Sequence, residues 1–237
     1  NDTEKELKIH IAHGKHNSLT DAQVDEIVTL VRASEWIPEP PKTFVADDKV
    51  KVRKVFYKNR YDILLAADLY MPSDMNMDVR NPVLIIGHPF GAVKEQCAGL
   101  YAQEMAKRGF VTLAFDASYQ GESGGTPRHT VSPDALVEDF SASVDWLGIQ
   151  PFVDRERIGV IGICGSGGFS VCAASIDPRI KALATVSMYD MGRATRNGLG
   201  DAMSDEQRKA MFAEVAVQRW REAEGAEPRI RFGTPER

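Results

Sequence analysis

The chain has 237 residues and a formal net charge of −5, with 43% hydrophobic and 27% charged residues. This composition is typical of a globular protein with a core of ordinary size, and the acidic balance argues against a nucleic-acid partner. No apolar run reaches the roughly 18 residues of a membrane span, and the first residues lack a secretory signal pattern. We therefore expect a cytoplasmic protein with no membrane partner. Its cysteines show neither zinc-binding nor disulfide spacing; they are Cys97, Cys164 and Cys172.

Residues 1–36 are predicted to form a helical hairpin. Thr20 and Gln23 make a capping box at the start of its second helix. An apolar stripe at helical spacing follows, formed by Val24, Ile27, Val28 and Val31. The proline-rich stretch 37–48 is predicted to be a linker. The hairpin also offers a surface through which the protein could form a homo-oligomer.

From residue 49 the pattern changes to short strands. Residues 49–57 and 62–71 flank a turn and predict an antiparallel hairpin. Beyond them, short apolar strands alternate with helices, which predicts a mostly parallel α/β sheet with right-handed crossovers. The expected strands are 83–87, 111–115, 158–163 and 182–187, and the expected helices are 93–108, 165–176 and one that starts at Pro133 after an N-cap at Ser132.

The sheet domain is predicted to cover residues 49–190, and the strand signal stops after residue 187. Residues 191–237 are predicted to form a helical segment that resembles a lid. Ser204 and Gln207 give this segment a capping box of its own.

The strongest chemical signal is the glycine-rich segment 162–168, which follows a predicted strand and opens a predicted helix. A nucleophile elbow needs this context, because its nucleophile sits on a tight, strained turn between strand and helix. Gly162 lies two residues before Cys164, and the N–H of Gly165 just after it can donate to an oxyanion. A helix N-terminus also favours the thiolate form of a cysteine. The pattern therefore predicts Cys164 as the nucleophile.

A second register of the same segment stays open, in which Ser166 is the nucleophile and Cys164 takes the place of the first glycine. The predicted strand ends at Gly162, and this favours Cys164. Two interpretations without catalysis compete with both registers. One is a dinucleotide-binding turn, which would need a different glycine spacing and a later acidic residue. The other is a structural cysteine, the common role of a free thiol.

Two further loops follow predicted strands and would face the same space. In the first, His88–Gly91, we expect a second oxyanion N–H from Phe90, because Pro89 has none. His88 is a candidate substrate-pocket residue, although a packed histidine is the commoner role.

The second loop begins at Asp116, at the carboxyl end of a predicted strand, where ligands bind in open α/β sheets. Glu122 is a candidate for the substrate pocket, and His129 for a substrate contact. The simpler interpretations are a loop-fixing hydrogen bond for Asp116 and structural or solvated roles for the other two.

Residues from about 45 to 190 resemble an α/β-hydrolase, close to the dienelactone hydrolase group and its peptidase- and esterase-like relatives. The matching segments are His88–Gly91, Phe115–Ser123 and Gly162–Gly168. Dienelactone hydrolases use a cysteine in a Gly-x-Cys-x-Gly-Gly elbow, and this chain departs from that pattern by placing Ser166 at the second glycine. The resemblance implies hydrolysis of a small-molecule ester, lactone or thioester through an acyl-enzyme. We expect neither a cofactor nor a metal.

The first 30 residues resemble helices of the carboxymuconolactone decarboxylase family. That family's cysteine-containing catalytic part has no counterpart here, so no decarboxylase role is expected. His10, His13 and His16 lie in this part of the chain. His10 and His13 are spaced for a metal on one helix face, but a solvated cluster is the simpler interpretation.

The second half of a hydrolase triad is missing from the sequence. In this fold the triad runs nucleophile, acid, histidine along the chain, yet no histidine follows Cys164 and the last one is His129. The strands that would carry the acid and the base also have no counterpart, so we expect the sheet to lack its last two strands. A truncated chain, completion by a second chain, or a relative without catalysis would each explain this.

Two functions from different classes remain. The first is an α/β-hydrolase that forms an acyl-enzyme on Cys164, or on Ser166, with its base and acid outside this chain. The second is a catalytically silent α/β-hydrolase-like module for binding or dimerisation.

Overall fold

The computed structural model describes residues 41–227. The chain divides into two units between Pro41 and Lys42, within the predicted linker. The predicted helical hairpin at residues 1–36 lies outside the described residues, and so do the histidines in it. None of the described helices is both long and apolar enough to cross a membrane.

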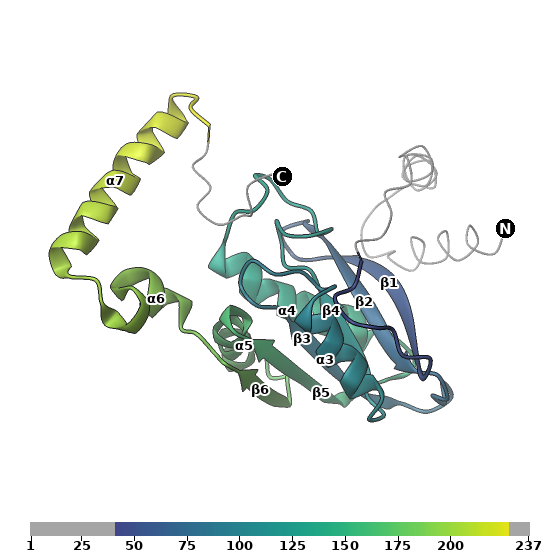
Figure 1. The fold of residues 1–237 in the computed structure, drawn as a ribbon. Helices are drawn as coiled ribbons and strands as arrows, with labels where there is room; N and C mark the ends of the chain where they lie inside the picture. The colour runs from purple at the N-terminus through teal and green to yellow at the C-terminus, as the bar shows by residue number, and fades with distance from the viewer. Residues whose placement is uncertain (1–40, 228–237) are drawn as a thin grey trace, which may run out of the picture. The chain divides into compact units, whose positions relative to one another are not determined.

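A six-stranded sheet forms the centre of residues 42–227 (Figure 1). Its spatial order is β1-β2-β4-β3-β5-β6. The first two strands form the predicted antiparallel hairpin, β2 also pairs antiparallel with β4, and the remaining pairs are parallel. The fold class predicted from the sequence is thus confirmed. The strands are β1 (Val50–Lys58), β2 (Leu64–Pro72), β3 (Asn81–Gly87), β4 (Val111–Phe115), β5 (Val153–Ile163) and β6 (Ala182–Val186).

Helices cover both faces of this sheet because alternate residues of its central strands point in opposite directions. Ile85 packs into one apolar core with α4 (Pro133–Gly148) and α5 (Gly165–Ile176), whereas the next residue, Ile86, packs into a second core with α3 (Cys97–Ala106). Strands that are buried on both faces read as continuous apolar runs, which is why their positions could be predicted.

The helix boundaries follow local capping chemistry. The Ser132 side chain accepts a hydrogen bond from the Ala135 N–H, with Pro133 at the first position of α4, as predicted. The predicted capping box of Ser204 and Gln207 opens α7 (Asp205–Ala223).

Two helical predictions differ from the structure. The helix expected from residue 93 begins only at Cys97, because Lys94 is held in the preceding loop by hydrogen bonds. The segment from residue 191, predicted as helical, begins with a separate short helix, α6 (Met191–Asn197), and a 3₁₀ turn at Leu199–Asp201, whose individual bounds the sequence did not indicate. Within the described part of the chain, α6 and α7 contain no buried residue.

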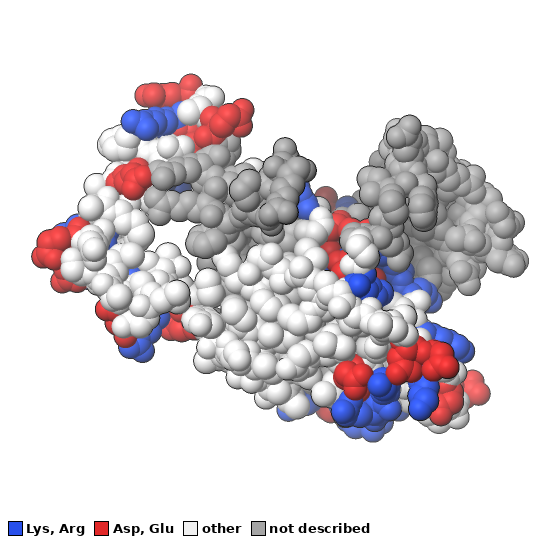
Figure 2. Space-filling view, viewed as in Figure 1, with Lys and Arg blue, Asp and Glu red and all other residues white. Residues whose placement is uncertain are grey.

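Charged side chains of both signs are interspersed on the face shown in Figure 2, and a wide central area carries neither sign. No single-sign field gathers there, in line with the modest net charge of −5.

Candidate active site

Cys164 occupies a sharp turn between β5 and α5. β5 ends at Ile163, α5 begins at Gly165, and Cys164 between them has φ 55° and ψ −117°. A residue with a side chain rarely adopts a positive φ, and such strain is found mostly at functional sites. The structure therefore places the strained position of a nucleophile elbow at Cys164. Ser166, the alternative, lies inside the helix.

Backbone hydrogen bonds hold this turn in place. The Cys164 N–H donates to the Val186 carbonyl at the end of β6 over 2.8 Å. The Cys164 carbonyl accepts from the N–H groups of Gly167 at 3.0 Å and Tyr189 at 3.1 Å. The turn is thereby tied both to its own helix and to the neighbouring strand, which offsets the strain at Cys164.

Glycines allow the backbone around the turn to pack closely. An ideal Cβ on Gly162 would lie 2.2 Å from Ser170 Oγ and 2.6 Å from the Ser166 carbonyl oxygen. One on Gly165 would lie 2.9 Å from Phe90 Cβ. Phe90, in the loop after β3, therefore lies directly against Gly165, the residue that follows Cys164. The sequence predicts these two residues, Gly165 and Phe90, as the oxyanion donors.

Ser166 fits at the second glycine position because its neighbour on β3 is itself a glycine. An ideal Cβ on Gly87 would lie 2.8 Å from Ser166 Cβ. Any larger residue at position 87 would therefore displace Ser166. The departure from the dienelactone pattern is accommodated by Gly87.

His88 is buried, with 4% of its surface exposed, and both of its ring nitrogens are engaged. Nε2 accepts a hydrogen bond from the Ala117 N–H at 3.0 Å, so the ring proton sits on Nδ1, which donates to the Pro89 carbonyl at 2.8 Å. Burial lowers the pKa of His88, because the charged form loses its hydration. The neutral imidazole, with both ring nitrogens hydrogen-bonded, fixes the loop that carries Phe90 and has no free nitrogen for proton transfer.

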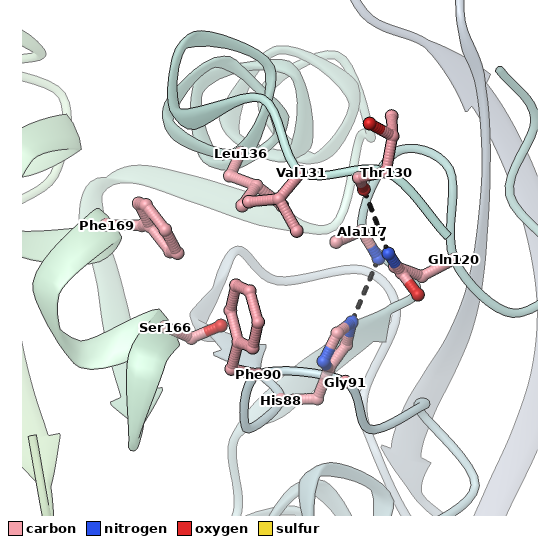
Figure 3. A pocket seen from close by; sticks show the side chains of 10 residues that line it. All are labelled: His88, Phe90, Gly91, Ala117, Gln120, Thr130, Val131, Leu136, Ser166 and Phe169. Atoms are coloured by element: carbon pink, nitrogen blue, oxygen red, sulfur yellow. Dashed lines mark hydrogen bonds between the residues drawn. The ribbon is translucent and has the colours of Figure 1, made fainter. Parts of the chain in front are cut away.

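A small pocket opens beside the elbow at the carboxyl ends of the parallel strands (Figure 3). Its walls come from the loops after β3 and β4 and from the first turns of α4 and α5. Among the predicted site residues, His88, Phe90 and Ser166 line it. The sequence analysis missed the apolar walls, which are Val131, Leu136 and Phe169.

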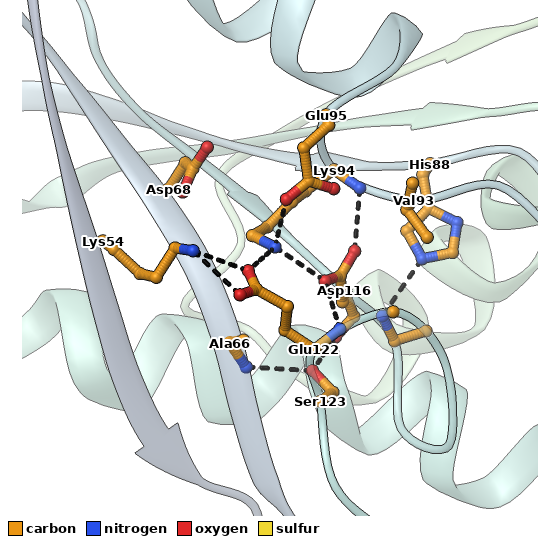
Figure 4. A network of polar contacts seen from close by, with 12 residues as sticks. Lys54, Ala66, Asp68, His88, Val93, Lys94, Glu95, Asp116, Glu122 and Ser123 are labelled. Atoms are coloured by element: carbon orange, nitrogen blue, oxygen red, sulfur yellow. Dashed lines mark hydrogen bonds and ion pairs between the residues drawn. The ribbon is translucent and has the colours of Figure 1, made fainter. Parts of the chain in front are cut away.

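Glu122 does not line this pocket. Its carboxylate binds Lys54 and Lys94 instead, on the other side of the loop (Figure 4). Burial would raise the pKa of Glu122, but the two ammonium groups outweigh burial and hold that pKa below its usual range. In the structure Glu122 is thus an ion-pair partner of two lysines and not a lining residue of this pocket.

The sequence analysis also missed Lys94, which is fully buried. Its ammonium lies among three carboxylates, those of Glu95, Asp116 and Glu122, whose oxygens are within 4.8 Å of one another. Burial alone would lower the pKa of Lys94, but the carboxylates raise it. Asp116 binds the Lys94 ammonium and backbone N–H, each at 2.8 Å, and the Glu122 N–H at 2.9 Å. This cluster joins the loop after β3 to the loop after β4.

Of the described residues, only His88 and His129 are histidines. His129 is exposed and contributes its backbone N–H to the Tyr119 carbonyl. Neither is placed as a base for Cys164 by the contacts of the described residues.

The chain matches the X-Pro dipeptidyl-peptidase (S15) family over residues 62–229. It is 56% identical to the uncharacterized protein PA2218 of Pseudomonas aeruginosa over 82% of this chain and 51% of that one. It is 37% identical to the thiohydrolase aneE of Aspergillus aculeatus over 46% of this chain and 34% of that one. The chain spans about half the length of PA2218 and about a third of the length of aneE.

Solved structures agree with this grouping. The crystal structure of PA2218 superposes with a TM-score of 0.77 and 54% identity, over 81% of this chain and 60% of that one. The α/β-hydrolase GrgF of a Penicillium species gives a TM-score of 0.62 at 21% identity, over 76% and 57%, and this likeness shows the fold alone. With its alternating sheet, its strand–turn–helix junction at Cys164 and its family match, the chain has an α/β-hydrolase fold and belongs to the X-Pro dipeptidyl-peptidase (S15) family.

Proposed function

We propose that Cys164 attacks the carbonyl carbon of an ester, lactone or thioester and carries the acyl group as a covalent thioester. The observation that carries the proposal is the strained backbone of Cys164, which has a φ of 55° at the point where β5 meets α5. In the first step the bond from sulfur to carbon forms, the bond from carbon to the leaving oxygen or sulfur breaks, and that atom takes a proton. Water, or a second acceptor, then takes the acyl group from Cys164.

The N–H groups of Gly165 and Phe90 are the proposed oxyanion donors. Their residues adjoin, because a Cβ on Gly165 would touch Phe90 Cβ. Gly165 is also the first residue of α5, so its N–H is one of the groups at a helix start that have no partner within the helix. Both donors would stabilise the negative charge that builds on the carbonyl oxygen.

The substrate range rests on two likenesses. The elbow resembles that of dienelactone hydrolases, which act on lactones, and relatives carry the names thiohydrolase and acyltransferase. Both names describe the movement of an acyl group, which a cysteine thioester intermediate supports. We therefore place acyl transfer to water or to another acceptor ahead of peptide cleavage.

A covalent-adduct experiment tests the proposal. The protein is treated with p-nitrophenyl acetate, and the acylated residue is identified by peptide mass spectrometry. We expect one acetyl group on Cys164, its loss in Cys164→Ala, and its retention in Ser166→Ala. Cys172→Ala is the matched control, because Cys172 is an exposed cysteine on α5 away from the turn. Acetylation of Ser166 in place of Cys164, or of neither, would contradict the proposal.

One observation favours a second candidate function, an acyl-binding module without turnover. Both ring nitrogens of His88 are engaged, and no other described histidine lies at the elbow. The same experiment separates the two candidates. A single burst of nitrophenolate with a stable adduct indicates the binding module, whereas continued release that Cys164→Ala abolishes indicates the hydrolase.

A further inference from the structure

A second cysteine, Cys97, lies at the same edge of the sheet as the elbow. β3 and β5 are neighbouring parallel strands, and Gly87 at the end of β3 pairs with Gly162 near the end of β5. Cys164 follows β5 directly, and Cys97 is the first residue of α3, the helix that follows β3. A helix that crosses back from a parallel strand starts at the carboxyl edge of the sheet. Both cysteines are therefore placed at that edge, behind adjacent strands.

The two cysteines also share a face of the sheet. Both side chains pack against the apolar core on the α3 side, whose buried members include Tyr70, Ile86, Ala98, Ile161 and Ile163. Burial raises the pKa of the Cys97 thiol, and a negative charge on Cys164 raises that pKa further, which requires the two sulfur atoms to lie near each other. Cys97 and Cys164 are therefore neighbours in space, although 66 positions apart in the sequence.

The third cysteine lies elsewhere. Cys172 is exposed on α5, and this helix packs through Phe169 and Ala173 into the core on the opposite face of the sheet. All three thiols are free, and those of Cys97 and Cys164 are half-buried, so a small oxidant can reach them. A disulfide within one molecule is thus expected between Cys97 and Cys164 and not between Cys97 and Cys172.

We propose that hydrogen peroxide converts Cys164 and Cys97 into a reversible disulfide, and that this modification takes the thiol of the elbow out of reaction. The inference goes beyond the proposed function and does not depend on it, because two neighbouring thiols can be oxidised whether or not Cys164 accepts an acyl group. It gives Cys97 the role of the resolving thiol.

The reaction has two steps. The Cys164 thiolate attacks one oxygen of hydrogen peroxide; the sulfur–oxygen bond forms, the oxygen–oxygen bond breaks, and the departing hydroxide takes a proton to become water. Cys97 then attacks the sulfur of the Cys164 sulfenic acid; the disulfide forms, the sulfur–oxygen bond breaks, and the departing hydroxide takes the proton that Cys97 loses. The two thiols give up two electrons, and the peroxide becomes two waters.

The raised pKa of Cys97 agrees with this order of events, because a thiol that keeps its proton reacts slowly with peroxide. The disulfide also has a protective effect. A sulfenic acid without a partner is oxidised further to a sulfinic acid, which thiols do not reduce. With Cys97 beside it, Cys164 is held in a form that a dithiol restores.

The test uses peptide mass spectrometry without reduction. Trypsin places Cys97 in peptide 95–107 but places Cys164 and Cys172 together in peptide 158–179, so the parent protein for the experiment is Cys172→Ser. After peroxide, we expect peptide 95–107 linked to peptide 158–179 in a protein that runs as a monomer, and we expect dithiothreitol to separate them. The absence of this linked peptide, or its presence only in a covalent dimer, would overturn the inference.

Cys97→Ser in the same parent is the matched variant, since it removes the resolving sulfur and keeps a side chain of similar size. Here we expect peroxide to carry Cys164 to the sulfinic acid, which dithiothreitol does not reverse. Equal sulfinic acid at Cys164 with and without Cys97 would contradict the resolving role. Thermal unfolding checks that the variant is folded, and the linked peptide of the parent is measured independently of it.

The nitrophenolate burst separates this inference from the proposed function. In the parent, we expect peroxide to lower the burst about tenfold and dithiothreitol to restore it. If the reduced protein shows no burst, the proposed function fails and the linked peptide alone decides on the disulfide. A burst without any linked peptide after peroxide leaves the proposed function standing and overturns the disulfide.

Discussion

At the scale of single residues, the strained cysteine and the buried lysine are held by opposite means. Cys164 keeps its positive φ through uncharged backbone hydrogen bonds to Val186, Gly167 and Tyr189. Lys94 is held by charge, because its ammonium is fully buried among carboxylates. The first arrangement presents a thiol at the turn, and the second fixes the loops on either side of the pocket.

Replacing Lys94 tests how much this cluster contributes to stability. Lys94→Met keeps most of the side chain's volume but leaves Asp116 buried without its cation, and breaking a buried pair in this way costs about 3–5 kcal/mol. We expect that loss in the free energy of unfolding, measured by urea denaturation. Lys107→Met is the control, since Lys107 makes surface ion pairs with Asp47 and Glu104 and should cost far less. Similar losses for the two variants would show that the cluster is not held by charge.

Asp139 gives stability a dependence on pH. It is fully buried in α4 and accepts hydrogen bonds from Asn59 and Ser118, but desolvation outweighs these bonds and raises its pKa to about 6. The unfolded pKa is about 3.9, so the group favours folding fully below pH 4 and loses that contribution as the pH rises through 6.

The prediction for Asp139→Asn follows because the contribution of Asp139 to stability falls as the pH rises. Urea denaturation of both proteins between pH 4.5 and 7 should show the wild type losing about 2 kcal/mol of stability relative to the variant as the pH rises. A difference between the two that stays constant with pH, or that grows in the wild type's favour, would contradict the raised pKa of Asp139.

At the scale of elements, the junction of β5 and α5 depends on the absence of a side chain at Gly162. A Cβ there would meet Ser170 Oγ at 2.2 Å and, at 2.6 Å, the backbone oxygen of Ser166, which cannot rotate away. Gly162→Ala is therefore expected to cost about 2 kcal/mol or more and to slow acylation of Cys164, as measured by thermal unfolding and by the nitrophenolate burst. Gly148→Ala is the control, because the one atom near its ideal Cβ is Arg155 Nε at 3.9 Å. A stable, rapidly acylated Gly162→Ala protein would show that the turn tolerates a side chain.

The elements themselves could largely be predicted from local pattern. Neighbouring residues in the sequence determine the apolar runs of β3, β4 and β5 and the helix caps at Ser132 and Ser204. The late start of α3 could not be predicted, because it depends on Lys94 binding Asp116, a partner 22 positions along the chain.

At the scale of the whole molecule, the elbow could be predicted because its residues are neighbours in the sequence, whereas the pocket could not because its residues are distant. The elbow is one continuous segment, so its strand, glycines and helix start could be recognised together. The pocket joins residues as distant in the sequence as His88 and Phe169, and its lining emerges only when β3, β4 and α5 are brought together. Nothing in the residues next to Lys94 marks it as buried, since lysines are almost never buried unless paired and its partners Asp116 and Glu122 lie in another loop.

The lysine cluster also has a consequence for how the site responds to its surroundings. Carboxylates gathered around a loop crossing are commonly bridged by a dissociable ion such as calcium, and such a joint loosens when the ion is diluted or chelated. Here the bridging cation is the covalently tethered ammonium of Lys94. The loops that frame the pocket are therefore held together by a charge that neither dilution nor a chelator can remove.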